Sequence, residues 1–297
     1  DVLLGIGDDA ACLALPQGQT LLVSTDTLVS GVHFLPKWSA YDIAYKSVMV
    51  NISDMAAMAA VPSWITLALT LPVVDNTWLE AFSRGLHDSL SQFNLSLVGG
   101  DTTKGPLSIT LTIMGYCSYD KVIKRGGAKV GDIIFVSGPI GGAALAVKYL
   151  NKSMNQVHRN ELMDKLLHPK PRVDLRDLLQ NYANSAIDIS DGLSADLNHI
   201  CVESGGLGAC LIQKDIPLHH LLEQYLGEHA MAFALTGGDD YELCFTVAAE
   251  KVDAFVTEAK QYNLGCYSIG VIESEPGLRI DTGTQYEPFV PKGYSHF

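Results

Sequence analysis

The chain has 297 residues, of which 47% are hydrophobic and 18% charged, and its formal net charge is −13 at pH 7. This length is enough for two domains, each with its own core. The acidic balance argues against nucleic-acid binding through a basic patch. No apolar stretch reaches the roughly 18 residues of a membrane-spanning helix, and no signal peptide is visible, so we expect a soluble globular protein.

The cysteines point to a reducing compartment. None of the six lies at C-x-x-C spacing from another, which gives poor support for a zinc site. Most lie in apolar runs, so buried, reduced thiols and a cytoplasmic location are the simpler expectation. The chain opens at Asp1 rather than at Met, from which we expect that a native N-terminal segment precedes it.

In the first part of the chain, strand-like and helix-like segments alternate. The patterns predict, in order, a strand at 21–24 entering a turn at 25–27, a helix at 40–60 ended by Pro62, a strand at 64–71, a helix at 78–93, and strands at 95–98 and 107–116. This order predicts an α+β domain over residues 1–118, a mixed sheet with its helices on one face.

A polar, glycine-rich stretch at 124–132 resembles a connector and precedes a second domain, residues 119–297. The patterns there predict strands at 133–136, 185–189, 241–247 and 267–272, helices from Ala143 and at 193–203, and a loop or surface helix at 149–165. The turn at 138–142 either places a helix N-terminus at a phosphate or is a tight strand–helix turn. We expect an α/β domain.

Six short segments pair an aspartate with glycine, serine or threonine: 7–9, 24–27, 51–54, 99–103, 188–192 and 237–240. Carboxylates and hydroxyls are hard oxygen ligands suited to Mg²⁺, and small residues let the backbone approach a phosphate closely. Singly, each has a simpler explanation, such as a capped turn at 24–27 or helix capping by Ser190 or Asp191. Together they predict one site where magnesium ions hold phosphoryl groups.

Other phosphate-binding signatures are absent. The sequence has no G-x-x-x-x-G-K-[ST] loop and no protein-kinase motif set, and the EF-hand pattern fits none of the acidic segments. Lys46 falls on the same helical face as Asp54 and could be its ion-pair partner. His33 is the only histidine near a motif, and we expect it to bind a substrate phosphate rather than transfer a proton.

As an ordered set, segments 5–10, 24–34, 51–58, 99–103, 188–193, 237–243 and 292–297 resemble the thiamine-monophosphate kinase family. The wider superfamily shares only parts of the set; it includes aminoimidazole ribonucleotide synthetase, selenophosphate synthetase and a hydrogenase maturation factor. The resemblance implies direct transfer of the ATP γ-phosphate to thiamine phosphate. It also implies a homodimer formed through the N-terminal sheet, with ATP near the dimer seam.

Residue by residue, the resemblance implies several Mg²⁺ ions, whose ligands would be Asp9, Ser24, Thr25, Asp26, Asp54, Asp101, Asp188 and Asp191. ATP would contact Gly100, Asp101, Arg125 and Ser190, and thiamine phosphate would contact His33, Asp239 and Tyr294. Asp54, Asp101 and Asp188 would be the catalytic set. The family often has glutamate at position 239, so the shorter aspartate there could act through a bridging water.

Two alternatives remain at this point. Another ATP-using enzyme of the superfamily would need features that are missing here: a reactive cysteine with a lysine near the start, or a C-terminal cysteine, where this chain has His296 and Phe297. A protein that binds a divalent metal or a nucleotide without catalysis is the alternative from a different class.

Overall fold

The computed structural model describes residues 1–296, and the chain divides into two compact units. Unit 1 comprises Asp1–Ala56 and Ala60–Val122, and unit 2 comprises Ala57–Ala59 and the chain from Ile123 onward. The division after Val122 lies close to the boundary expected from the sequence. Each unit has its own sheet and its own core, and we describe each by itself.

Unit 1 is built on a four-stranded sheet with the strand order β3-β6-β4-β5. Its elements are β1 (Val2–Leu4), β2 (Cys12–Leu13), β3 (Thr20–Val29), α1 (Ala40–Ala57), β4 (Val61–Leu71), α2 (Asn76–Gln92), β5 (Ser96–Lys104) and β6 (Ser108–Cys117). β4 and β5 run parallel, whereas the other neighbours are antiparallel. The expected order of strands and helices and the mixed sheet are therefore confirmed; the short hairpin of β1 and β2 was not expected.

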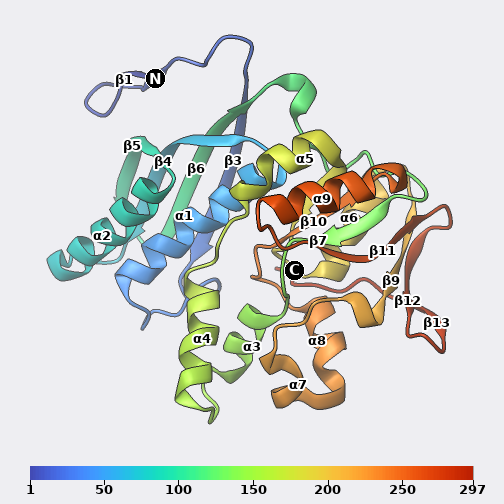
Figure 1. Ribbon diagram of the computed structural model, residues 1–297. Helices are drawn as coiled ribbons and strands as arrows, with labels where there is room; N and C mark the ends of the chain where they lie inside the picture. The colour runs from blue at the N-terminus through green and yellow to red at the C-terminus, as the bar shows by residue number, and fades with distance from the viewer. Residues whose placement is uncertain (297) are drawn as a thin grey trace. The chain divides into compact units, whose positions relative to one another are not determined.

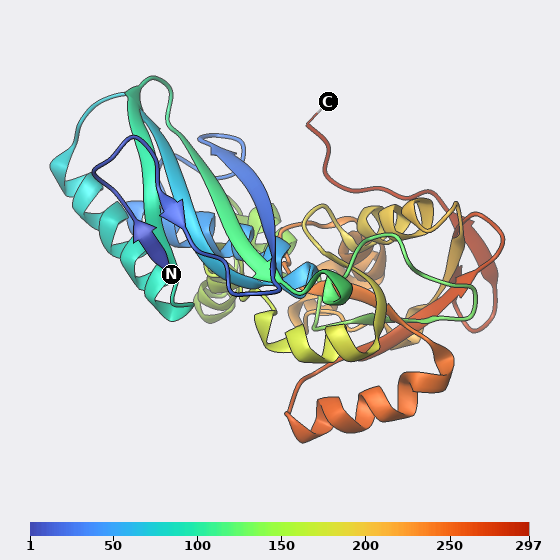
Figure 2. The ribbon, with the colours of Figure 1, turned by 90° about the horizontal axis from the view of Figure 1, so that it is seen from above.

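The two faces of this sheet differ in exposure, and the difference positions the candidate site. On β6, Ile109, Leu111 and Ile113 are buried, and Leu22 of β3 lies on the same face, which α1 and α2 cover (Figures 1 and 2). We call this the covered face. The alternate residues, among them Thr110 and Thr112, point to the other side, which we call the open face.

Three local expectations in unit 1 were wrong. Residues 24–27 form no turn, because β3 continues through them to Val29. The 99–103 segment lies inside β5 rather than at its end. Helix α1 ends at Ala57, before Ala59 with its positive φ of 54°, and Pro62 already belongs to β4.

Unit 2 contains a seven-stranded sheet in the order β13-β12-β9-β11-β7-β10-β8. The strands are β7 (Ile133–Val136), β8 (Ala183–Asp188), β9 (Gly208–Ile212), β10 (Leu243–Val247), β11 (Tyr267–Glu273), β12 (Gly277–Asp281) and β13 (Tyr286–Phe289). The helices are α3 (Gly142–Tyr149), α4 (Gln156–Leu167), α5 (Arg176–Tyr182), α6 (Leu193–Glu203), α7 (Leu221–Leu226), α8 (Ala230–Thr236) and α9 (Val252–Gln261). Only β9 and β12 pair in parallel.

Helices lie on both faces of this second sheet. Phe135 and Phe245 stack with ring centroids 5.6 Å apart, and Phe255 of α9 packs edge-on against both. Cys244 precedes Phe245 on β10, so its side chain points to the opposite face of the sheet. There, burial and the nearby Asp196 of α6 raise the pKa of the Cys244 thiol. The α/β architecture of the second domain is thus confirmed. No helix within residues 1–296 is both long and apolar enough to cross a membrane.

Candidate active site

Unit 1 brings three of the predicted magnesium ligands together on the covered face. Ser24 and Asp26 project from β3 and Asp54 from α1, and the Ser24 hydroxyl donates a hydrogen bond to Asp54 Oδ2 over 2.5 Å. Burial and, secondly, the negative charge of Asp54 raise the pKa of Asp26 to about 6. Two carboxylates and a hydroxyl thus share a poorly solvated place, an arrangement that a cation would stabilise.

Two other predicted ligands lie on the open face instead. The hydroxyl of Thr25 lies 2.9 Å from that of Thr112, because successive residues of β3 alternate between faces. Register places Asp101 beside Ala68 of β4, which lies opposite Thr110 of β6. Laterally paired residues share a face, so Asp101 belongs to the same face as Thr110. The side chain of Thr25 therefore does not join Asp26 at one ion, contrary to the expectation of a shared turn.

Of the remaining predicted residues of unit 1, two lie in loops and the third is a glycine at a close approach of two main-chain segments. Asp9 is exposed between β1 and β2, and its N–H donates to Asp8 Oδ1 over 2.9 Å. Nδ1 of His33 accepts the N–H of Val29 over 3.0 Å, which places the proton of the neutral ring on Nε2. A Cβ at Gly100 would lie 2.0 Å from the carbonyl oxygen of Leu67, so only glycine fits there.

In unit 2, main-chain hydrogen bonds hold two of the acidic segments side by side. Asp188 ends β8 and is only 5% exposed. After Asp188, the N–H of Ile189 donates to the carbonyl of Glu242 over 2.7 Å, and the N–H of Tyr241 donates to the carbonyl of Ile189 over 2.9 Å. The N–H of Asp239 donates to the carbonyl of Ser190 over 2.8 Å. Segments 188–192 and 237–242 therefore form one continuous surface.

The segment at 292–294 joins the same surface. The N–H of Tyr294 donates to the carbonyl of Asp191 over 3.0 Å, and the Ser194 hydroxyl donates to the carbonyl of Lys292 over 2.5 Å. Gly293 fits between them because a Cβ there would lie 2.7 Å from the Asp191 carbonyl oxygen. The structure thus gathers Asp188, Ser190, Asp191, Asp239 and Tyr294, which the sequence predicted as metal, ATP and substrate residues.

Asp196 is a residue of this surface that sequence reasoning missed. Its Oδ2 accepts the N–H groups of Asp191 and Gly192 over 3.2 and 3.0 Å at the start of α6. The N-cap of α6 is Gly192, without a side-chain cap bond, so the alternative that Ser190 or Asp191 caps this helix is wrong. Burial, then the charge of Asp191, raises the pKa of Asp196 to about 7, against the opposing effect of Arg125, which therefore lies within electrostatic reach.

A second missed group borders the glycine turn before α3. The half-buried Asp240 accepts the N–H of Gly141 over 2.7 Å, and loss of solvation above all raises its pKa to about 8. Glu242 accepts from Ser137 Oγ over 2.6 Å and from Arg172 over 3.0 Å. Because a protein carboxyl group takes the Gly141 N–H, the turn is better explained as tight strand–helix packing than as a phosphate site. Asp240 lies within the 237–240 segment and Glu242 within the 237–243 match, but the sequence pattern assigned neither residue a role.

The fold and this surface agree with comparisons to known proteins. Residues 7–117 match the family model described as AIR synthase related protein, N-terminal domain, and residues 129–283 match the C-terminal domain of the same family. The thiamine-monophosphate kinase of Escherichia coli strain K12 is 48% identical over 302 aligned residues, which cover 100% of this chain and 93% of that protein.

Two solved structures resemble the chain over nearly its full length. The thiamine-monophosphate kinase of Stenotrophomonas maltophilia K279a is 43% identical, with a TM-score of 0.88 and coverage of 95% of this chain and 91% of that one. A structure described as AaThiL complexed with AMPPCP and TMP is 32% identical, with a TM-score of 0.85 and coverage of 98% and 92%.

Proposed function

The chain belongs to the thiamine-monophosphate kinase family and uses ATP to phosphorylate thiamine phosphate, and we propose that several Mg²⁺ ions on its acidic segments support a direct, in-line transfer. The observation that carries this proposal is the full-length match to kinases of that name, one solved with AMPPCP and TMP. The product would be thiamine diphosphate, with ADP released. Membership in this family sets aside both alternatives left open by the sequence.

The residues present fit magnesium. Ser24, Asp26 and Asp54 offer only oxygen atoms, the hard donors that Mg²⁺ prefers. Burial and, secondly, the charge of Asp54 raise the pKa of Asp26, and a cation bound there would oppose both effects. In unit 2, Asp188 and Asp191 offer a second set, and burial and then the charge of Asp191 raise the pKa of the neighbouring Asp196. We assign both sets to Mg²⁺, together with Asp9.

The open face suits ATP and a partner subunit. Asp101 lies on it, in the strand that also holds Gly100, and Thr25 lies on the same face. Leu21 and Val23, which alternate with the covered residues of β3, are 43% and 57% exposed. Apolar exposure on a sheet face favours association with another surface. We therefore propose a homodimer formed through the open face of unit 1, with ATP near the seam.

The proposed phosphoryl transfer requires little proton transfer by protein side chains. The nucleophile is a phosphate oxygen that is already largely ionised near neutral pH, so no strong general base is required. Bound Mg²⁺ would neutralise the charge of the two approaching phosphates and of the leaving ADP. Arg125, which lies within reach of Asp196, would hold a phosphate of ATP through its planar guanidinium, and Ser190 would contact ATP beside it.

The acceptor would bind next to these groups. Tyr294 is 51% exposed on the surface shared with Asp191 and Asp239, and an aromatic ring beside carboxylates suits the thiazolium cation of thiamine phosphate. His33 would contact its phosphate. All six cysteines are free thiols, which supports a location in the reducing cytoplasm.

The test is the choice of acceptor. Purified protein with ATP and Mg²⁺ should release ADP with thiamine phosphate and not with thiamine, and EDTA should stop the reaction. Thiamine serves as the matched control because it differs only in carrying a free hydroxyl group. Phosphorylation of thiamine at a similar rate would indicate an ordinary hydroxyl kinase and overturn the proposal, as would full activity in EDTA.

A further inference from the structure

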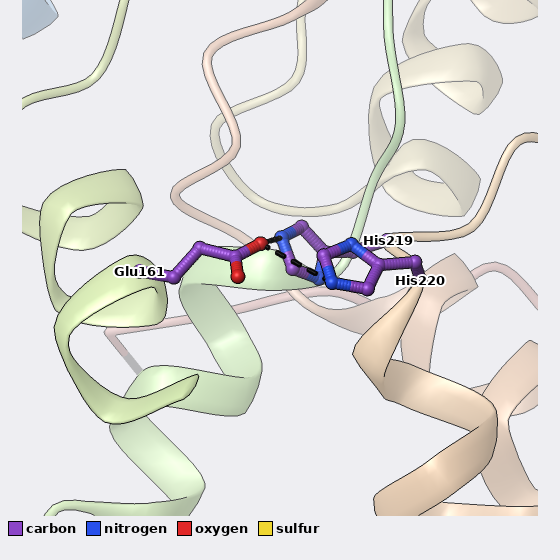
Figure 3. Close-up of side chains that lie close together, drawn as sticks. All are labelled: Glu161, His219 and His220. Atoms are coloured by element: carbon purple, nitrogen blue, oxygen red, sulfur yellow. Dashed lines mark ion pairs between the residues drawn. The ribbon is translucent and has the colours of Figure 1, made fainter. Parts of the chain in front are cut away.

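A cluster of metal-binding side chains lies in unit 2 among residues that the kinase site does not use. Glu161 of α4 meets His219 and His220, which directly precede α7, and one potential ligand atom from each lies within 4.8 Å of the other two (Figure 3). Oε1 of Glu161 is 3.3 Å from Nε2 of His219 and 3.4 Å from Nε2 of His220. One carboxylate oxygen therefore faces two imidazole nitrogens.

These nitrogen–oxygen distances suit neighbouring ligands of a tetrahedral metal ion better than they suit direct hydrogen bonds. A charge-assisted N–H···O bond is about 2.7–2.9 Å long, which both contacts exceed. Zinc binds histidine nitrogen and carboxylate oxygen at about 2.0–2.2 Å, so neighbouring ligands of a tetrahedron lie about 3.3–3.5 Å apart. His220 is 67% exposed and can turn its ring to adjust the remaining distance between the two imidazoles.

The surroundings prepare His219 as a neutral ligand. Burial and the neighbouring His220 lower its pKa to about 4, and Lys165 acts in the same direction against the opposing charge of Glu161. The Leu221 N–H donates to Nδ1 over a long 3.4 Å, which leaves the ring proton on Nε2 in the metal-free state. A metal at Nε2 requires the other neutral tautomer, in which the proton moves to Nδ1 and the long hydrogen bond from Leu221 is given up.

The backbone holds the histidine pair firmly in place. The N–H of His219 donates to the carbonyl of Ile140, and the N–H of Ile140 donates to Pro217, both over 2.9 Å. The ring lies against the start of α3, where a Cβ on Gly142 would come within 2.8 Å of it. Two of the ligands are thus preorganised on a segment whose conformation does not depend on the metal, and Glu161 approaches from the middle of a regular helix.

We propose that Glu161, His219 and His220 bind one transition-metal ion, with Zn²⁺ as the expected metal and a fourth position open to water. Two imidazoles and a carboxylate favour zinc over magnesium, which prefers oxygen ligands alone. The ion would join α4 to the segment before α7 and so stabilise unit 2. The cysteine spacing, which gave poor support for a zinc site, carries no information about this histidine and glutamate set.

The test measures zinc on untagged, EDTA-stripped protein in excess Mg²⁺ and without nucleotide. Cys12 is an exposed thiol that could also bind zinc, so every variant is made in a Cys12→Ser background. We expect one zinc per chain to remain after gel filtration and to raise the melting temperature. His220→Ala and Glu161→Gln should each weaken zinc binding by more than about 10-fold, since even changes to outer partners of a metal cost about 10–100-fold.

Matched controls are His229→Ala and Glu250→Gln, which remove a solvent-exposed histidine and glutamate elsewhere in unit 2. Both should bind zinc as the parent does. Since His220 is exposed, the metal-free His220→Ala variant should melt with the metal-free parent, which separates loss of the ion from loss of the fold. No retained zinc in the parent, or equal affinity in the His220→Ala and parent proteins, would overturn the proposal.

Discussion

The two units hold their acidic residues in different ways. In unit 1, Ser24 and Asp26 come from the interior of a strand and Asp54 from the last turn of a helix, and their side chains meet because β3 and α1 pack together. In unit 2, Asp188, Ser190 and Asp191 lie where β8 ends and α6 begins, and main-chain bonds to the 237–242 and 292–294 segments fix them.

This difference predicts different sensitivities. The first arrangement depends on which side chains carry charge, because the backbone beneath them is regular. The second depends on the close approach of main chains, which glycines at 238 and 293 permit. Substitutions that change charge should therefore matter most in unit 1, and substitutions that change main-chain spacing should matter most in unit 2.

The largest expected effect comes from Asp54→Asn. The amide oxygen can still accept from Ser24, so the fold should persist, but a negative charge is lost beside Asp26. We expect kcat to fall by about 100-fold or more, a loss typical of removing one group that stabilises charge in the transition state. Asp120→Asn, at an exposed position of the same unit, is the control. Normal turnover with an unchanged melting curve would remove Asp54 from the site.

Gly238→Ala tests the second arrangement. Its Cβ would lie 2.3 Å from the Ser190 carbonyl oxygen and would push the two segments apart. We expect kcat/KM for thiamine phosphate to fall about 10–100-fold, because small displacements of binding groups are costly. Gly265→Ala, whose Cβ would make only an ordinary 3.9 Å contact, should leave the kinetics unchanged. Wild-type kinetics in both variants would show that the main-chain spacing is unimportant.

The dependence on pH should distinguish the side-chain cluster of unit 1. Asp26 has a pKa of about 6, so at pH 5 it is mostly protonated and offers Mg²⁺ a poorer ligand. We expect the Mg²⁺ concentration at half-maximal activity to rise about tenfold between pH 7 and pH 5, since only about a tenth of a group is ionised one pH unit below its pKa. In Asp26→Asn the remaining activity should lose this dependence; retention of the full pH effect in that variant would contradict the assignment.

The smallest effect concerns Asp240 in unit 2. Its pKa is raised from 3.8 to about 8, so the stability associated with its protonated form is full below pH 4 and is lost as the pH rises through 8. Asp240→Asn keeps an acceptor for the Gly141 N–H without the buried charge. We expect the variant to melt about 2 °C or more above wild type at pH 9, with a smaller difference at pH 4. Melting curves that differ equally at both pH values would refute this.

The regular elements with strong patterns could be predicted from the sequence. The limits of β7 and α6 were predicted to the residue, and α1 and α2 to within a few residues, because their apolar spacing records which face is buried. The segment at 24–27 was mistaken for a turn because serine, threonine and aspartate are common in turns. In the structure the hydroxyl groups of Thr25 and Thr27 pair with threonines of β6, a distant strand that local composition does not reveal.

Other features depend on contacts between distant parts of the chain. The short strands β9, β12 and β13 become regular only by pairing within the sheet of unit 2, and the sequence did not predict them. Thr25 and Asp26 point to opposite faces because β3 continues through both of them. A turn was expected there from the sequence, so this division was not predicted. Asp196 was missed because its side chain folds back to the main chain of Asp191 and Gly192, a contact that the helical pattern at 193–203 does not indicate.

The bonds from Tyr294 to Asp191 and from Lys292 to Ser194 have a consequence for how the enzyme ages. An exopeptidase that removes residues back past Lys292 would take away Tyr294, for which we propose a contact with the acceptor, while every strand of the seven-stranded sheet stayed paired. On that proposal, clipped molecules would unfold as the intact protein does and yet have little activity, so old preparations should lose specific activity before they lose structure.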